Sequence, residues 1–417
     1  MRLQDISGIK GATIILDIDG TLTVPGGTIV DPVLVAVAAK LREHNDVYLL
    51  SNRGDHKRDA LIAASLGIDY ITTPFRKPHP ATLRGVTRKE TLVVIGDKVL
   101  TDGLLALFTR ARFIRVERLV GERDGMADRI AHAIDDVVAY AWNALHLMRP
   151  TQWVKNVLVF APLFFAREFF NPSILSATTA AFVAFCFIAS AGYIVNDVLD
   201  VAADRLHPHK KYRPLAMGSV TVGMALALSA ALALAALGFL FIYAPGAILI
   251  SIIYGISSVA YSTYFKRVPV IEMLGFIWFY FARVLAGSMA GNVPLSAWIV
   301  LAIIFLALFL VAAKRYAEKT LGRSRSVLAA YPERFLEGLL FLSAGLVVVF
   351  YGVYSVLGVA SPIAVYSAIP VLAAILRYLQ LAFTGQAAEY PEQLLLRDRG
   401  LQIAGIAWFL IMLAVFY

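Results

Sequence analysis

Beyond residue 150 the sequence consists mainly of long apolar stretches separated by short polar loops. An α-helix needs about 20 apolar residues to cross the hydrocarbon core of a bilayer. We expect about nine such membrane helices, centred near 151–170, 174–197, 220–242, 245–264, 270–290, 295–313, 336–357, 362–383 and 401–417. The chain is 59% hydrophobic and 16% charged, which argues against both a single soluble domain and a disordered chain.

The part of the chain before about residue 145 has a different composition. Acidic and basic residues nearly balance there, so the formal net charge of +9 falls almost entirely in the apolar part. The N-terminal apolar run is too short for a signal peptide and lacks a small-residue cleavage site. We therefore expect a cytosolic soluble domain joined to an all-α polytopic membrane domain. The single cysteine, Cys186, excludes an intramolecular disulfide framework.

Basic residues indicate how the membrane domain is oriented. With a cytosolic N-terminus, the inside loops carry most of its lysines and arginines, and the opposite loops carry only Arg167. Those inside loops are about 198–219, 265–269, 314–335 and 384–400. Positive loops lie on the cytoplasmic side. The predicted location is the inner (cytoplasmic) membrane, multi-pass, with the N-terminal domain and the active sites facing the cytosol.

Two aspartates follow an apolar run that is typical of a buried strand, residues 13–16. Carboxylates spaced i, i+2 at a strand end suit phosphoryl transfer, with Asp17 attacking phosphorus and ligating Mg²⁺ and Asp19 protonating the leaving oxygen. This pair alone does not distinguish a catalytic site from an ordinary turn.

Further polar residues continue the pattern along the chain. Ser51 and Asn52 follow a second strand-like run, Lys77 comes next, and Asp97 and Asp102 follow a third. This order resembles the haloacid dehalogenase phosphatase superfamily over about residues 8–120. The runs KPHP and GDKVLTD are similar to its branch containing phosphatidylglycerophosphate phosphatases.

That resemblance implies a Rossmann-like α/β fold and specific roles. Asp17 is then the nucleophile and Asp19 the acid/base, both at a Mg²⁺ site completed by the two later aspartates. Ser51, Asn52 and Lys77 bind the phosphate. The intervals from Asp19 to Ser51 and on to Lys77 are too short for a cap domain, so we expect an open site that admits a lipid phosphate.

An amphipathic pattern over residues 126–146 predicts a linker helix packed on a neighbour, with attachment to the bilayer surface as the alternative. We therefore divide the chain into a phosphatase-like domain (1–125), a linker helix (126–146) and a membrane domain (147–417).

The second apolar stretch ends in an acidic motif. Asp197, Asp200 and Asp204 are spaced i, i+3, i+7, on one helix face, and Asn196 joins that face. Three neighbouring carboxylates repel one another unless a cation lies between them, and Mg²⁺ shares such ligands with substrate phosphates. Mn²⁺ is the alternative ion.

A basic run, HPHKKYRP (207–214), follows at once and suits phosphate oxygens. We expect His207 and His209 to be structural rather than metal ligands. The motif NDxxDxxxD resembles that of the UbiA superfamily of intramembrane transferases over about residues 145–417. Prenyltransferases of that superfamily carry a second aspartate-rich motif, whereas here Tyr261 and Lys266 are followed by one carboxylate, Glu272.

Five runs, RPTQWVKN (149–156), HPHKKYRP, AKRYAE (313–318), ILRY (375–378) and LLRDRGLQ (395–402), look like the decaprenyl-phosphate phosphoribosyltransferase family. That family transfers phosphoribose from phosphoribosyl pyrophosphate to a polyprenyl phosphate. The resemblance implies metal-binding, catalytic aspartates at 197, 200 and 204. The substrate-binding candidates in this half are Lys155, Asn196, Lys210, Arg213, Tyr261, Lys266, Arg283, Lys314 and Arg315.

Charged residues within apolar spans, such as Arg283 and Arg377, are functional-site candidates because a buried charge is costly. Structural ion pairs with Glu272, Glu318 or Asp398 are the alternative.

Together these features predict a bifunctional enzyme that makes a polyprenyl-phosphoryl phosphoribose and then removes its 5-phosphate. The main alternative is a UbiA-type prenyltransferase using an isoprenyl diphosphate and an aromatic acceptor, with a phosphatase domain acting on another lipid phosphate such as phosphatidylglycerophosphate. A third possibility is a transporter with a regulatory domain. We disfavour it because no inverted repeat is evident in the sequence. No nucleic-acid module is found, and a homo-oligomer stays open.

Overall fold

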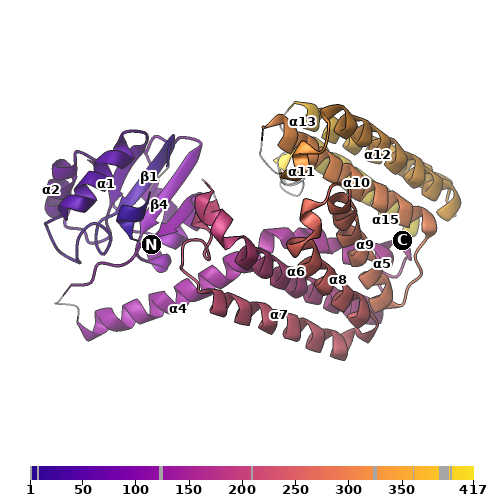
Figure 1. Cartoon of the computed structure of the whole chain (residues 1–417), viewed down its shortest axis with the longest axis horizontal. Coiled ribbons are helices and arrows are strands. Elements are labelled where there is room, and N and C mark those ends of the chain that lie inside the picture. The colour runs from indigo at the N-terminus through magenta and orange to yellow at the C-terminus, as the bar shows by residue number, and fades with distance from the viewer. Residues whose placement is uncertain are drawn as a thin grey trace. The chain divides into compact units, whose positions relative to one another are not determined.

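The computed structural model describes residues 2–6, 9–121, 125–207, 210–322, 326–359, 361–384, 394 and 397–417. The chain divides into two compact units (Figure 1). The first unit joins Met1–Leu147 to Asp200–Met224, and the second joins Met148–Leu199 to Ala225–Tyr417. A segment from the middle of the chain thus belongs with the N-terminal part, which a linear division of the sequence does not anticipate.

A five-stranded parallel sheet forms the centre of the first unit. All six residues of its central strand β1 are buried, because such a strand is covered on both faces. The strands are β1 (Ala12–Asp17), β2 (Asp46–Leu50), β3 (Asp69–Tyr70), β4 (Thr91–Gly96) and β5 (Arg112–Arg115), in the spatial order β3-β2-β1-β4-β5. This confirms the predicted α/β architecture of the N-terminal part.

Helices pack on both faces of this sheet. Ile14 and Leu16 belong to a cluster that includes residues of α1 and α2, while Ile15 lies in a second cluster with α3, as the two-residue repeat of a strand requires. The helices are α1 (Pro32–Arg42), α2 (His56–Leu66), α3 (Leu104–Thr109) and α4 (Met126–Met148), with short turns η1 (Leu3–Asp5), η2 (Pro80–Leu83) and η3 (Val99–Gly103).

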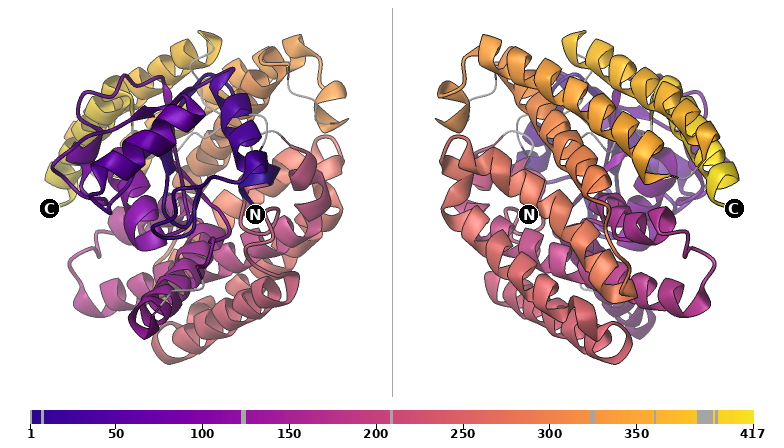
Figure 2. Two further views of the ribbon diagram at one scale, coloured as in Figure 1. Left: turned by 90° about the vertical axis from the view of Figure 1, so that its left-hand side faces the viewer. Right: turned by 90° about the vertical axis from the view of Figure 1, so that its right-hand side faces the viewer.

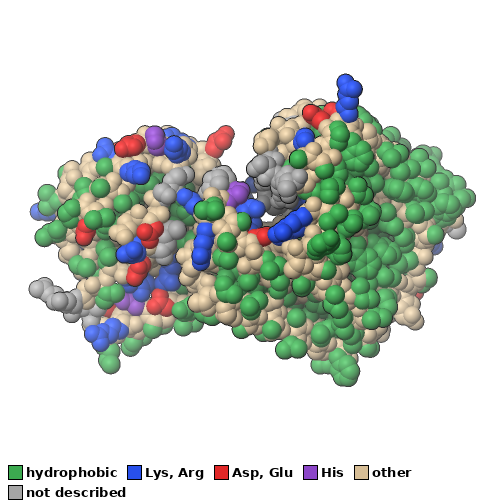
Figure 3. Space-filling model, viewed as in Figure 1, with side chains coloured by type: hydrophobic (Ala, Val, Ile, Leu, Met, Phe, Trp, Pro, Cys, Tyr) green, Lys and Arg blue, Asp and Glu red, His purple; other side chains and the backbone are tan. Residues whose placement is uncertain are grey.

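Eight helices are long and apolar enough to cross a membrane among the residues that the structure describes. These candidate spans are Pro172–Leu206, Val222–Tyr243, Pro245–Thr263, Ile271–Gly291, Ala297–Thr320, Glu333–Gly358, Pro362–Phe383 and Arg399–Phe416. Figure 3 shows mostly hydrophobic side chains over the visible surface of the second unit, and more charged side chains over the first. An apolar surface of this extent is expected where helices face lipid.

The α-helices of this region are α5 (Ala161–Phe165), α6 (Pro172–Leu206), α7 (Val222–Tyr243), α8 (Ile248–Thr263), α9 (Ile271–Gly291), α10 (Ala297–Thr320), α11 (Ser326–Ala329), α12 (Glu333–Val353), α13 (Ala368–Phe383) and α15 (Arg399–Phe416). Shorter 3₁₀ or π turns connect them: η4 (Pro150–Phe160), η5 (Lys210–Tyr212), η6 (Pro245–Ala247), η7 (Phe265–Arg267), η8 (Tyr354–Gly358) and η9 (Pro362–Ser367).

The prediction of nine long membrane helices is corrected at its first member. Residues 150–165 form the 3₁₀ helix η4 and the short α5 instead of one α-helix. Pro162 cannot donate the i→i−4 hydrogen bond that a continuous helix needs there. At about 2.0 Å per 3₁₀ residue and 1.5 Å per α residue, this segment still extends about 30 Å, similar to the bilayer core.

Small residues allow the helices of the second unit to approach closely. Ala181 and Ala184 of α6 and Ala282 of α9 are fully buried in one cluster. A methyl group added to Gly287 of α9 would lie 1.8 Å from the carbonyl oxygen of Val159 in η4, so only glycine fits. Such packing is typical of membrane helices. Elsewhere α12 lies alongside α10, and α15 alongside α13 (Figure 2).

Candidate active sites

Three aspartates predicted to bind a metal meet at the carboxyl edge of the sheet. Asp17 ends β1, Asp97 directly follows β4, and Asp102 lies in the η3 turn. One carboxylate oxygen from each lies within 4.8 Å of the others, and all three residues are buried. The carboxyl ends of neighbouring parallel strands share one edge, which explains how residues 85 positions apart in sequence come together.

Lys77 lies against two of these carboxylates. Its ammonium group donates to Asp17 and to Asp102. Burial raises the pKa of Asp17 to about 8, although Lys77 opposes this effect. Burial by itself would lower the pKa of Lys77, but the carboxylates of Asp102 and Asp17 outweigh it and keep this pKa above its ordinary value. The ammonium group therefore stays charged beside the predicted nucleophile.

The cluster also fits a divalent cation. Asp97 Oδ1 is buried and has no hydrogen-bond partner among the described residues, while its Oδ2 accepts from Arg118 Nε at 2.6 Å. Burial raises the pKa of the Asp97 carboxyl, and the Arg118 guanidinium opposes it. Mg²⁺ prefers oxygen ligands, and this cluster offers three carboxylates, one of which has an oxygen without a hydrogen-bond partner among the described residues.

Two glycines allow this close approach. A Cβ atom at Gly20, whose φ is 83°, would lie 2.7 Å from Asp97 Oδ2. A Cβ at Gly96 would lie 2.3 Å from Asp102 Oδ2. Any larger residue would therefore displace a carboxylate of the cluster.

Asp19, the predicted acid/base, lies in an ion pair that the sequence did not reveal. Arg58 NH2 and NH1 donate to its two oxygens at 2.9 and 3.1 Å, and Ser51 Oγ donates at 3.1 Å. Burial raises the pKa of Asp19, but hydrogen bonds from Arg58 and from the Gly26 amide outweigh it and hold this pKa below its usual range. The only sequence signal for Arg58 is its place in the basic first turn of α2.

Other polar residues of the first unit support the same edge of the sheet. Asn52 exchanges two hydrogen bonds with the backbone of Lys77, at 2.7 and 2.9 Å. Asp135 of α4 accepts from Arg118 NH2 at 3.0 Å and from the Leu100 amide at 3.0 Å. The predicted linker helix thus contacts Arg118, which binds Asp97, and the η3 turn, which its amphipathic pattern alone did not indicate.

The short intervals between the predicted site residues hold only elements of the α/β fold. Between Asp19 and Ser51 the chain forms one loop, α1 and β2, and between Ser51 and Lys77 it forms α2 and β3. Neither interval holds a separate cap domain.

The second acidic motif lies on the last turns of α6, which continues to Leu206. Asp197 and Asp204 are buried, and Asp200 is half-buried. Asp197 accepts from Arg149, a residue that was not among the predicted site residues. Asp204 accepts from Arg213 NH1 at 2.6 Å, and Lys210 Nζ lies 4.0 Å from its Oδ1. Positions 208 and 209, including His209, lie outside the described residues, as do 395 and 396.

Other predicted phosphate-binding residues lie in the second unit. Lys266 Nζ in η7 lies 3.4 Å from Asn196 Oδ1, which brings the YxxxxK run to the acidic helix. Tyr261 stacks edge-on with Phe276, and Lys314 Nζ lies 5.4 Å from the centre of the same ring. Lys155 donates to Gln152 Oε1 at 2.7 Å.

Two buried arginines among the candidates have other described partners. Arg283 donates to Asn156 Oδ1 at 2.7 Å, to Tyr254 OH at 2.8 Å and to the Phe279 carbonyl. These acceptors are neutral, so the guanidinium links η4, α8 and α9.

Arg315, the other buried arginine, lies between two carboxylates. It donates to both oxygens of Glu272 and to Glu318. Nearer the C-terminus, Arg377 NH2 donates to Asp398 Oδ2 at 2.8 Å. The alternative of structural ion pairing is thus observed for Arg315 and Arg377.

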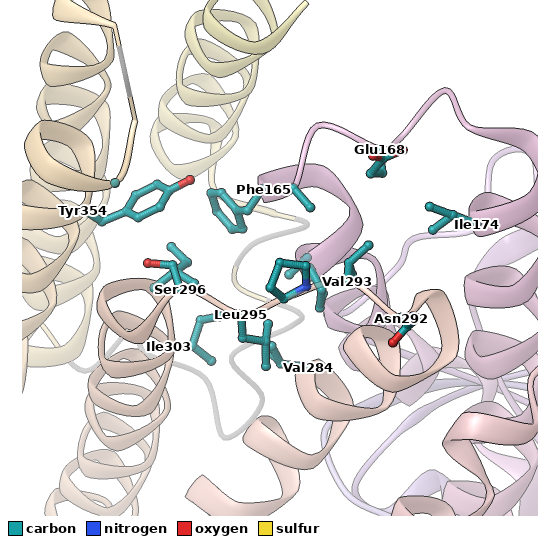
Figure 4. Close-up of a pocket in the computed structure, with 16 residues that line it drawn as sticks. Phe165, Glu168, Ile174, Val284, Asn292, Val293, Leu295, Ser296, Ile303 and Tyr354 are labelled. Carbon is teal, nitrogen blue, oxygen red and sulfur yellow. The ribbon is translucent and has the colours of Figure 1, made fainter.

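A cavity of about 550 Å³ lies within the second unit (Figure 4). It is lined by residues of α5, of the α9–α10 connection, of α10 and of η8, including Phe165, Val293, Ile299 and Tyr354. Ile174, near the start of α6, also lines it, 23 residues before Asp197. The described lining includes none of the predicted site residues.

The membrane domain matches known proteins. Residues 157–395 match the model of the UbiA prenyltransferase family. Decaprenyl-phosphate phosphoribosyltransferase of Mycobacterium tuberculosis strain H37Rv is 38% identical over 272 residues, covering 63% of this chain and 90% of that protein. The Corynebacterium glutamicum protein of the same name is 37% identical over 284 residues, covering 64% and 85%.

Solved structures agree on the fold. A UbiA homologue from Archaeoglobus fulgidus bound to GPP and Mg²⁺ superposes with a TM-score of 0.53 at 20% identity, covering 66% of this chain and 99% of that chain. At this identity the similarity concerns the fold alone. Together with the apolar helices, these matches confirm the prediction of a multi-pass helical membrane protein.

Proposed function

The chain belongs to the UbiA prenyltransferase family, and from this premise we propose that its membrane domain transfers 5-phosphoribose from phosphoribosyl pyrophosphate to a polyprenyl phosphate. The observation that carries the proposal is the end of α6, where Asp197, Asp200 and Asp204 follow one another on a single helix. Arg149 contacts the first of these aspartates, and Arg213 contacts the last. The names of the relatives support the same substrates.

The chemistry requires binding and charge neutralisation more than a protein nucleophile. An oxygen of the lipid phosphate attacks the anomeric carbon, the bond to pyrophosphate breaks, and pyrophosphate leaves with the electron pair. Asp197, Asp200 and Asp204 would hold Mg²⁺, which would supply charge neutralisation for that leaving group. Lys210, Arg213 and Lys266 bind and orient phosphate oxygens, and such positioning supplies most of the catalysis.

The connection between α8 and α9 supports phosphoribosyl rather than isoprenyl transfer. The single carboxylate there, Glu272, is buried with both oxygens bound by Arg315. One carboxylate whose two oxygens both accept from Arg315 offers fewer metal ligands than the two aspartates of a second DxxxD motif would.

For the N-terminal domain we propose an uncapped phosphatase that removes the 5-phosphate of the lipid product. Asp17 attacks phosphorus, the bond from phosphorus to the ribose oxygen breaks, and water then releases inorganic phosphate from Asp17. Asp19 takes a proton from that water and gives it to the leaving oxygen in the next turnover, and its lowered pKa favours the base half of this role. Ser51 and Lys77 bind the phosphate, and Asp17, Asp97 and Asp102 would hold Mg²⁺, which would neutralise the phosphate charge. The cluster around Lys77 supports this assignment.

Both reactions are proposed to occur at the cytosolic face of the inner membrane. Positive loops support that orientation. Holding two sites on one chain raises the effective concentration of the intermediate at the second site.

The test uses detergent-purified full-length protein, Mg²⁺, labelled phosphoribosyl pyrophosphate and a polyprenyl phosphate. We expect the wild type to form a ribolipid without its 5-phosphate, and Asp17→Asn to stop at the phosphoribosyl lipid. Asp69→Asn, at an exposed position on β3, is the matched control. If no lipid is labelled, the donor is wrong, and isoprenyl diphosphates become the substrates to test. If Asp17→Asn behaves like the wild type, the phosphatase assignment is wrong.

A further inference from the structure

The segment that follows the acidic end of α6 packs on the α/β core of the first unit. Residues 200–224 belong to that unit. Tyr212 and Met217 pack against the hydrophobic cluster formed by β1, β2, β4 and their covering helices. Leu215 and Val220 are also buried. The segment is therefore built into the N-terminal domain.

Its most specific contact is between Arg112 and Tyr212. The guanidinium carbon of Arg112, the first residue of the edge strand β5, lies 3.7 Å from the centre of the Tyr212 ring. This distance indicates stacking of the planar guanidinium on the ring face, a favourable cation–π geometry. Both side chains are half-buried, so the contact is partly shielded from water.

In the sequence, Tyr212 lies between Lys210 and Arg213, two of the basic residues proposed to bind substrate phosphates. Lys210–Tyr212 form the single turn η5, and the Arg213 amide donates to the Lys210 carbonyl at 2.9 Å. Arg213 also donates to Asp204 at 2.6 Å. The position of the Tyr212 ring therefore restricts both neighbouring cations relative to Asp204.

We propose that Arg112 is a positioning residue for the transferase: by stacking on Tyr212 it fixes Lys210 and Arg213 for the diphosphate of the donor. The α/β domain then orders the donor-binding segment 200–224, in addition to its proposed phosphatase reaction. The expected change in KM rests on the proposed transferase function. The ordering of residues 200–224 by Arg112 does not depend on that function.

The kinetic test is a double-mutant cycle on full-length protein. Arg112→Ala and Tyr212→Leu should each raise the KM for phosphoribosyl pyrophosphate about fivefold, with a smaller change in kcat, because ground-state binding is weakened. Tyr212→Phe keeps the ring face and should retain the wild-type KM. The KM of the double variant should not exceed that of either single variant, because each substitution removes the same contact.

Arg88→Ala, at an exposed arginine of the same domain, is the matched control. Hydrolysis of a small aryl phosphate should change less than twofold in all variants. Effects of Arg112→Ala and Tyr212→Leu that multiply in the double variant, or an unchanged KM, would overturn the inference.

Hydrogen exchange separates this inference from the function it rests on. If wild-type protein transfers no phosphoribose, the proposed function fails, and the segment is still testable. Arg112→Ala should then accelerate exchange of amides in residues 211–220 at least about threefold relative to Arg88→Ala, because the contact that orders them is lost. Equal protection in the two variants would show that Arg112 does not position the segment.

Discussion

Asn52 and Lys77 hold each other through two hydrogen bonds, in which the Lys77 amide donates to Asn52 Oδ1 at 2.7 Å and Asn52 Nδ2 donates to the Lys77 carbonyl at 2.9 Å. The side-chain amide thereby fixes the backbone from which the Lys77 ammonium reaches Asp17 and Asp102. Asn52 thus acts on the carboxylate cluster through Lys77.

Replacing Asn52 should therefore reduce phosphatase activity without removing any charged group. We expect Asn52→Ala to lower kcat/KM for phosphate-ester hydrolysis about 10- to 100-fold, the equivalent of one or two buried hydrogen bonds. Steady-state kinetics of Asn52→Ala and Lys77→Met measures this effect. We expect the lysine variant to lose more of its kcat/KM. Activity of Asn52→Ala equal to the wild type would contradict the role assigned to the amide.

Gly20 offers a test with an internal control. Gly20 and Gly85 both have φ of 83°, but a Cβ at Gly20 would lie 2.7 Å from Asp97 Oδ2, whereas none of the described atoms lies within 4 Å of one at Gly85. The backbone strain of an alanine is therefore similar at both sites, and only Gly20→Ala displaces the carboxylate. We expect Gly20→Ala to weaken Mg²⁺-dependent hydrolysis at least about tenfold, and Gly85→Ala to leave it within about twofold. Mg²⁺ titrations of both variants decide between these outcomes.

Mg²⁺ binding at the phosphatase site should strengthen as the pH rises. Burial raises the pKa of Asp17 to about 8, so below that pH its carboxyl holds a proton that an entering cation displaces. The apparent Kd for Mg²⁺ should fall by up to about tenfold per pH unit between about pH 6 and 8, and level off above. Mg²⁺-dependent hydrolysis at constant ionic strength measures it. A Kd that is constant over this range would mean that Asp17 is already ionised.

The acidic end of α6 should matter for only one of the two activities. We expect Asp197→Asn and Asp204→Asn each to lower phosphoribosyl transfer at least about 100-fold, because each removes a charge that balances the leaving group. Aryl phosphate hydrolysis should stay within about twofold. Transfer and hydrolysis assayed on the same preparations test this, and a parallel loss of both activities would indicate misfolding instead.

Arg315 should contribute more to stability than Arg377. The Arg315 side chain is 1% exposed between Glu272 and Glu318, whereas that of Arg377 is 39% exposed beside Asp398. Arg315→Met removes the guanidinium that lies between two buried carboxylates and should cost about 3–5 kcal/mol. Arg377→Met should cost much less, because solvent screens the exposed ion pair with Asp398. Thermal unfolding in detergent compares them, and similar midpoints would show that the buried network is not stabilising.

Local patterns were sufficient for much of this fold. The apolar run before Asp17 predicted a buried strand, and β1 is buried throughout. Long apolar stretches predicted membrane helices because a bilayer demands about 20 apolar residues in a row. The prediction of one long helix at 151–170 was wrong, although this stretch is apolar. Pro162 lacks the amide hydrogen that a continuous α-helix needs at that position.

Partners distant in sequence were not predictable. The spacing of Asp17, Asp97 and Asp102 resembled a known family, yet nothing in it linked Asp19 to Arg58 or Asp97 to Arg118. An arginine forms such an ion pair only when the fold brings its element next to that of the aspartate. A single sequence does not show how far apart two such elements lie.

Residue type and spacing establish which segments enter the membrane, which strand ends carry carboxylates and which helix face is acidic, because these properties depend on neighbours along the chain. Long-range packing establishes how those groups are paired. It determines that Lys77 lies between two aspartates, that Arg315 binds Glu272, and that Tyr212 stacks under Arg112. These contacts join different elements, so their geometry exists only once hydrophobic burial has brought the elements together.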